Sequence, residues 1–334
     1  MSQNKITMGL LLLFLPLAAA AADQEEMENA YMELRNAYST AASAAEKLTL
    51  VQNYLVRFPE SERTARVLSA ATYLLSEEMN DHAGAIAYTK EILTKVEDPE
   101  ITGAVRLVLV DLYDSPAYAK ELKTLAVVMA EAGQQSFSDY LSLIRAATGA
   151  EVWTMVQELC QTAQPLANAK TYQADFPDRD FTEDDIQQAG KNRQGLLGTY
   201  KGWALAHGGH PDEALRTFAE SEGLVRFSYL GVPENNLYLY WGQTLLENQA
   251  YDAALLSLSK AAVWGYSKDA MAAARKAYTA KNGHENGFDE YIWSVRQKHA
   301  KTIDDFTLLN YQDQKQPLSD LKGKVTLVTF WFPT

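Results

Sequence analysis

Few residues in this sequence are of types that could act in catalysis or metal binding, and the neighbours of the only cysteine do not favour a reactive thiol. Cys160 lies in "WTMVQELCQTA", at helical spacing from the apolar residues Trp153 and Val156. That pattern predicts a buried, inert thiol. A reactive thiol needs a nearby cation or helix N-terminus to lower its pKa, and the surrounding residues offer neither. A single cysteine also leaves the chain without an internal disulfide.

Two groups of polar residues have the ligand types of a metal site. His207 and His210 are three residues apart in "HGGH", a spacing seen in zinc sites, but no cysteine or carboxylate cluster completes a ligand set nearby. We predict a turn between helices. The acidic stretch comprises Asp175, Asp178, Asp180, Glu183, Asp184 and Asp185. It lacks the alternating D-x-D-x-D-G loop of a calcium site, so we predict a solvated linker that leads into a helix. We expect no metal and no cofactor.

Aromatic residues gather at Tyr238, Tyr240 and Trp241, and again at Tyr291 and Trp293. Their helical spacing favours a place in the core, and a peptide-binding platform is the alternative. No Ser/His/Asp order, glycine-rich phosphate loop or paired-carboxylate motif stands out. We therefore expect no active site in the helical part of the chain.

The charge balance excludes one class of partner. The 334 residues include 43 acidic and 30 basic side chains, for a formal net charge of −13. An acidic protein of this kind repels phosphate backbones, so nucleic acid is not expected as a partner. The hydrophobic share of 47% is that of a folded globular protein.

Residues 1–22 have the organisation of a secretory signal peptide. One cation, Lys5, precedes an apolar run from Met8 to Leu17 and a series of alanines that ends at Ala22. The run contains a proline and is shorter than the ~20 residues of a spanning helix. We predict cleavage near Ala22 and export to a periplasmic or other extracytoplasmic location, without an integral membrane segment in the mature protein.

Residues 23–300 show apolar positions at steps of three and four, which predicts a helical body. Several helix starts combine a capping residue with a favoured neighbour: Asp98 before Pro99, Ser115 before Pro116, and Thr182 with Asp185 three residues later. Short connections between such helices predict antiparallel neighbours.

Two helix pairs share a pattern of small and bulky residues. The first pair has Gly202, Ala214, Phe218 and Ser221; the second has Gly242, Ala254, Leu258 and Ala261. Small residues let helix backbones approach closely, and bulky ones fill the groove beside them. The pattern resembles the tetratricopeptide repeat and is clearest over residues 195–281, with a weaker copy around Ala85. The resemblance implies a helical-hairpin solenoid that binds extended segments of partner proteins.

The residue pattern is no longer helical after Lys301, in "IDDFTLLNYQDQKQPLSDLKGKVTLVTFWFPT". We predict a strand around Phe306–Leu309, a polar turn, the returning "QPLSDL", a break at Gly323 and a strand over Val325–Trp331. This segment resembles the N-terminal part of thioredoxin-like domains of the redoxin group, most closely those of the exported TlpA-type thiol–disulfide oxidoreductases. The matching positions are Phe306, Leu308, Leu318, Ser319, Asp320, Leu321, Lys322, Gly323, Lys324, Val325, Leu327, Val328, Phe330 and Trp331.

The resemblance implies that residues 301–334 open an incomplete thioredoxin-like α/β domain. Its C-x-x-C pair would follow Thr334, so we expect no catalytic residue within the chain, only the flank formed by Phe330, Trp331, Pro333 and Thr334. We expect the sequence to be part of a longer protein, because an unpaired apolar strand is an aggregation hazard. Two alternatives stay open: a peroxiredoxin-type antioxidant domain, which "FWFPT" also resembles, and a non-enzymatic interaction scaffold.

Overall fold

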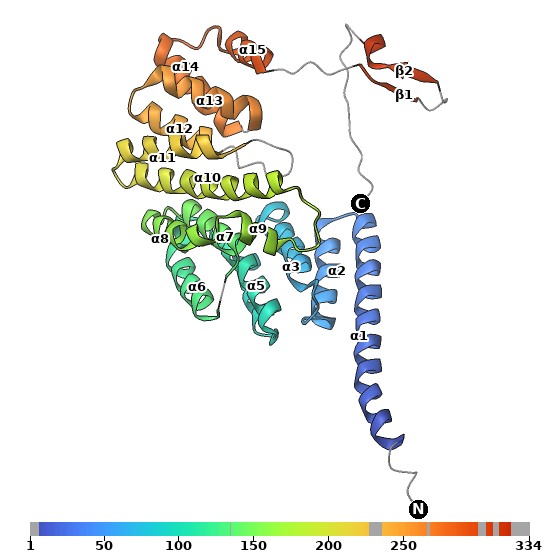
Figure 1. The fold of residues 1–334 in the computed structure, drawn as a ribbon. Coiled ribbons are helices and arrows are strands. Elements are labelled where there is room, and N and C mark those ends of the chain that lie inside the picture. The colour runs from blue at the N-terminus through green and yellow to red at the C-terminus, as the bar shows by residue number, and fades with distance from the viewer. Residues whose placement is uncertain are drawn as a thin grey trace, which may run out of the picture.

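The computed structural model describes residues 7–133, 135–226, 236–265, 268–299, 305–309 and 314–321, with side chains from residue 24 onward except at 264, 265, 299 and 321. This part of the chain is mainly helical (Figure 1), as the apolar periodicity predicts. The α-helices are α1 (Thr7–Thr40), α2 (Ala44–Arg57), α3 (Thr64–Tyr73), α4 (His82–Leu93), α5 (Pro99–Leu112), α6 (Ala119–Glu131), α7 (Phe137–Gly149), α8 (Trp153–Ala163), α9 (Ala169–Asp175), α10 (Glu183–His207), α11 (Pro211–Leu224), α12 (Asn236–Glu247), α13 (Tyr251–Gly265), α14 (Lys268–Asn282) and α15 (Phe288–His299).

Helix α1 runs without a break from Thr7 to Thr40 and includes the predicted cleavage point near Ala22. The domain boundary predicted at residue 23 stays a prediction. Export and cleavage remain predictions. No helix within the described residues is both long enough and apolar enough to cross a membrane.

Two of the predicted side-chain caps are confirmed; at the third position a helical turn begins at Pro116 as predicted, but without a side-chain cap. Thr182 accepts the backbone N–H of Asp185 at the start of α10, and Asp98 caps α5. Ser115 makes no side-chain capping bond. A 3-10 turn follows it, in which the N–H of Tyr118 donates to the Ser115 carbonyl at 3.0 Å. Because the backbone already uses that donor, the hydroxyl of Ser115 has no capping role, and α6 begins only at Ala119.

The helix pairs cross at the predicted small residues. A Cβ added at Gly202 would lie 2.7 Å from the ring of the fully buried Phe218, and one added at Gly242 would lie 2.5 Å from Leu258. These separations are too short for real atoms, so glycine allows α10 to pack on α11 and α12 to pack on α13. Figure 1 shows α10, α11, α12 and α13 following one another as antiparallel neighbours.

The last described segments form a small hairpin. Strand β1 (Thr307–Leu309) pairs antiparallel with β2 (Lys315–Pro317), and a helical turn covers Leu318–Leu321. The first strand was predicted; the second occupies part of the returning segment. Gly323, the strand predicted over Val325–Trp331 and the flank residues Phe330, Trp331, Pro333 and Thr334 lie outside the described residues.

Candidate binding cleft

A cleft of about 520 Å³ lies where α7, α8, α10 and α12 meet. Its walls carry the aromatic rings of Trp153, Tyr200, Trp203, His207 and Tyr240, and we call it the aromatic cleft. Tyr200 is buried, His207 is exposed, and the other three rings are half-buried. Aromatic surface therefore faces solvent here in a concave setting.

Helix α10 supplies one wall because of simple helical spacing. Tyr200, Trp203 and His207 follow one another at steps of three and four residues, which places them on one face of the helix. The ring of Trp203 stacks on Tyr240 of α12, with centroids 4.5 Å apart and planes 9° apart. It also meets His207 nearly perpendicularly, at 4.2 Å.

Helix α8 supplies the opposite wall through Trp153, its first residue. The Trp153 ring stacks on His207, with centroids 4.3 Å apart and planes 8° apart, and lies nearly perpendicular to Trp203 at 6.4 Å. A Schellman turn ends α7 just before it: Glu151 N–H donates to the Thr148 carbonyl and Val152 N–H to that of Ala147. Glu151 adopts the left-handed conformation that this turn requires, with φ of 56°.

The rim of the cleft is polar. Arg145 on α7, Glu151 in the turn and Asn236 at the start of α12 line it. Arg145 and Glu151 are both exposed and carry opposite charges. The rim is thus close to neutral, in a protein whose formal net charge is −13.

Arg193 links α10 to α7 and α9 outside the cleft. This residue of α10 is 7% exposed, and its guanidinium pairs with Asp175 of α9 at 2.6 Å. The guanidinium lies 4.5 Å from the ring centre of Phe137 in α7 and 4.9 Å from that of Tyr172 in α9. Arg193 therefore ties the helix that carries Trp203 to the helix that carries Arg145.

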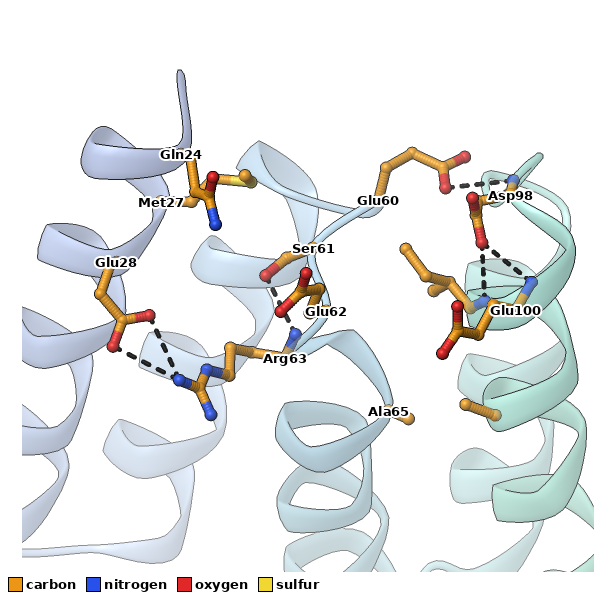
Figure 2. A pocket seen from close by; sticks show the side chains of 12 residues that line it. Gln24, Met27, Glu28, Glu60, Ser61, Glu62, Arg63, Ala65, Asp98 and Glu100 are labelled. Carbon is orange, nitrogen blue, oxygen red and sulfur yellow. Dashed lines mark hydrogen bonds and ion pairs between the residues drawn. The ribbon is translucent and has the colours of Figure 1, made fainter. Parts of the chain in front are cut away.

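A second cavity, of about 570 Å³, lies between α1, α3 and α5 and is lined with carboxylates (Figure 2); we call it the acidic cavity. Asp98 caps α5 by accepting two backbone N–H groups of its first turn, at 2.9 and 3.0 Å. Glu60 accepts the N–H groups of Glu97 and Asp98, and Glu28 pairs with Arg63 at 3.4 Å. These carboxylates bind groups of the protein itself, and so they stabilise the fold.

Cys160 lines a third cavity, of about 850 Å³, between α8, α10 and α11. The residue is 3% exposed, and its Sγ lies 3.5 Å from the Leu197 carbonyl oxygen, to which the thiol donates. Burial raises the pKa of the thiol to about 12, although the positive charge of Lys201 acts in the other direction. The prediction of a buried cysteine is confirmed, and the thiol is protonated at neutral pH.

The other predicted residues take varied places. His207 ends α10 and His210 directly precedes α11, so the predicted turn is confirmed. Within the described residues, no group of three or more His, Cys, Asp or Glu is arranged to hold a metal ion. The acidic stretch leads into α10 as predicted, except that Asp175 belongs to α9 and pairs with Arg193.

The core prediction for the aromatic residues is only partly correct. Tyr238 is buried, but Tyr240 forms a wall of the cleft, and Trp293 is 59% exposed. We did not single out Trp203 or Arg145 from the sequence. The spacing of Tyr200, Trp203 and His207 would have revealed one aromatic helix face, but not that this face meets solvent.

Comparison with known proteins adds no family assignment: no protein-family model matches the chain, and no curated protein matches it.

Proposed function

We propose that the helical body binds an extended segment of another exported polypeptide in the aromatic cleft. One observation carries this proposal: half-buried rings from three separate helices line a concave site. Aromatic side chains that keep apolar surface in contact with solvent are typical of binding surfaces, because covering them releases water and costs little side-chain entropy.

The helix pairs support the same proposal. Hairpins that cross at Gly202 and Gly242 have the tetratricopeptide-like pattern of small and bulky residues. Arrays of such hairpins build a solenoid with a curved inner surface suited to extended segments. In this proposal the cleft lies on the inner surface of the array, and the body itself performs no chemistry.

A selection from a random peptide library tests the binding function. We expect peptides that bind the full chain and lose binding to the Trp203→Ala variant. Recovery of no binders, or of binders that the variant holds equally well, would overturn the proposal. The Trp293→Ala variant is the matched control, because Trp293 is 59% exposed and does not line the cleft.

A second function is favoured by the hairpin at the end of the described chain. Strand β1 falls within the predicted strand Phe306–Leu309, and strand β2 overlaps the predicted returning segment. We propose that the body serves an exported thiol–disulfide oxidoreductase. Its reactive thiolate would attack a disulfide sulfur of the bound partner, displace the other sulfur as a thiolate, and form a mixed disulfide.

Cys160 cannot take that role, because its buried thiol keeps its proton at neutral pH. The redox cysteines of this proposal would follow Thr334. Sequencing the gene beyond codon 334 tests this directly, since absence of a cysteine in the next few codons removes the redox function. If cysteines are present, the longer protein should reduce insulin disulfides, and faster turnover of hydroperoxide would favour the peroxidase alternative.

A further inference from the structure

We infer that Asn286 is a site of spontaneous deamidation, and that the fold protects Asn282 from the same reaction. These two asparagines are the only ones in the sequence that a glycine follows, and they lie four residues apart where α14 leads into α15. A following glycine favours the reaction because it has no side chain to obstruct the attack. The sequence treats the two pairs alike, and hydrogen bonding separates them.

Deamidation joins the main chain to its own side chain. The main-chain nitrogen of Gly287 would attack the side-chain amide carbon of Asn286 and form a new C–N bond. The bond to the side-chain nitrogen then breaks, and ammonia leaves with the hydrogen that the Gly287 nitrogen gives up. Water opens the resulting five-membered imide to aspartate or isoaspartate. The step needs no reactant but water, and its rate depends on how freely the two groups can meet.

At Asn282 both reacting groups are already bonded. Asn282 is the last residue of α14, and its side-chain Nδ2 donates to the Tyr278 carbonyl oxygen at 2.9 Å. The N–H of Gly283, which would have to attack, donates to the Thr279 carbonyl oxygen at 2.8 Å. Both hydrogen bonds must break before the imide can form, so the end of the helix slows the reaction.

At Asn286 the corresponding groups are free. Asn286 and Gly287 are exposed and lie in a turn that the Phe288 N–H closes by donating to the Glu285 carbonyl oxygen at 3.1 Å. Within the described residues, neither the side-chain amide of Asn286 nor the N–H of Gly287 has a hydrogen-bond partner. The Tyr278 hydroxyl donates to the main-chain carbonyl oxygen of Asn286 at 3.1 Å, but that oxygen does not react.

The product would disturb the start of α15. Phe288, two residues after Asn286, is 1% exposed, and its ring meets that of Tyr278 at a centroid distance of 5.6 Å. Isoaspartate places a former side-chain carbon in the main chain, so it lengthens the turn that positions Phe288. We therefore expect the modified protein to pack this buried ring less well.

Ageing of the full chain at mildly alkaline pH tests the inference, with mass spectrometry to locate the modification. Asn286 should deamidate at least about tenfold faster than Asn282, because two hydrogen bonds protect the latter. In guanidinium chloride, which removes these bonds, the two rates should agree within about threefold. Equal rates in the folded protein, or a faster reaction at Asn282, would overturn the inference.

Two matched variants assign the site and its consequence. Asn286→Gln should abolish the fast reaction, because glutamine would have to close a larger ring, and Asn282→Gln should leave it unchanged. After equal ageing, the unmodified sequence should unfold at a lower temperature than Asn286→Gln. A fast modification that persists in Asn286→Gln would overturn the assignment of the site. An aged protein that is fully modified and unfolds at the temperature of fresh protein would overturn the consequence for α15.

Discussion

The acidic cavity and the aromatic cleft have similar volumes, about 570 and 520 Å³, but their side chains differ in how much of their bonding capacity and surface the protein itself uses. In the acidic cavity, Asp98 and Glu60 accept backbone N–H groups at the start of α5, and Glu28 pairs with Arg63 (Figure 2). In the aromatic cleft, the rings of Trp153, Trp203 and Tyr240 pack on neighbours through part of their surface and keep the rest exposed.

The difference shows why the number of polar groups is a poor guide to function. A carboxylate that caps a helix or holds a loop contributes to folding, and its bonds are complete without a ligand. A half-buried aromatic ring keeps apolar surface in water, and a ligand that covers this surface gains free energy. The two sites should therefore respond differently to substitution.

The largest effect is expected at Arg193, which links α10 to α7 and α9. Arg193→Ala removes a buried ion pair and the contacts with Phe137 and Tyr172. We expect the free energy of unfolding to fall by about 3 kcal/mol, measured by urea denaturation. Arg275→Ala is the matched control, because Arg275 also lies over a ring and pairs with Asp289, yet its side chain is 41% exposed. Arg275→Ala should lower the free energy of unfolding by less than about 1 kcal/mol. Equal losses would contradict the role assigned to burial.

Gly202→Ala should give the next largest effect, because the new Cβ would overlap the ring of the buried Phe218. We expect the free energy of unfolding to fall by about 2 kcal/mol, because α10 must shift to make room for the new methyl group. Peptide binding should also weaken, because Trp203 lies on α10 and shifts with it. Gly223→Ala is the control within the same hairpin. No atom lies within 4 Å of its added Cβ, so stability should rise by about 0.5–1 kcal/mol. A neutral Gly202→Ala would show that the crossing is looser than described.

A smaller effect is expected in the acidic cavity. Asp98→Ala removes the cap of α5 and should lower the free energy of unfolding by about 1 kcal/mol in the same denaturation assay. Peptide binding should not change. Glu62→Ala in the same cavity should alter stability by less than about 0.5 kcal/mol. Loss of ligand binding in either variant would show that the acidic cavity belongs to the binding site.

The effect of Cys160 appears only in alkali and is the smallest of the set up to pH ~9.5. Its pKa is about 12 in the folded protein against an ordinary 9.0, so above pH 9 the unfolded chain loses this proton while the folded chain keeps it. Stability should therefore fall as pH rises from 9 toward 12, by less than about 1 kcal/mol near pH ~9.5. Cys160→Ala should remove this part of the slope. Rapid alkylation of the native thiol at neutral pH would contradict its burial.

Several features were predictable because they depend on neighbours in the chain. The caps at Asp98 and Thr182, the turn at His207 and His210, and the buried Cys160 follow from local patterns. At Ser115 and Pro116 the position of the helix start was predicted, but the side-chain cap was not formed. A 3-10 turn and an α-helix can begin with the same Ser-Pro pair, and the choice depends on backbone bonds that the sequence does not reveal. Trp293 was mispredicted because helical spacing groups apolar residues but does not tell how much of a helix surface its neighbour covers: α15 packs on α13 and buries Ile292, while Trp293 stays 59% exposed.

What the sequence determined by itself is the pairing of adjacent helices. The close approach of α10 to α11 at Gly202, and of α12 to α13 at Gly242, depends on the missing Cβ and on the bulky residue that fills the space. Both residue types can be read from the sequence. The aromatic cleft was decided only by the tertiary structure. Its walls come from segments 145–153, 200–207 and 236–240, and the packing of one hairpin on the next brings them together. That packing sums many weak contacts between distant residues, so no local spacing encodes it.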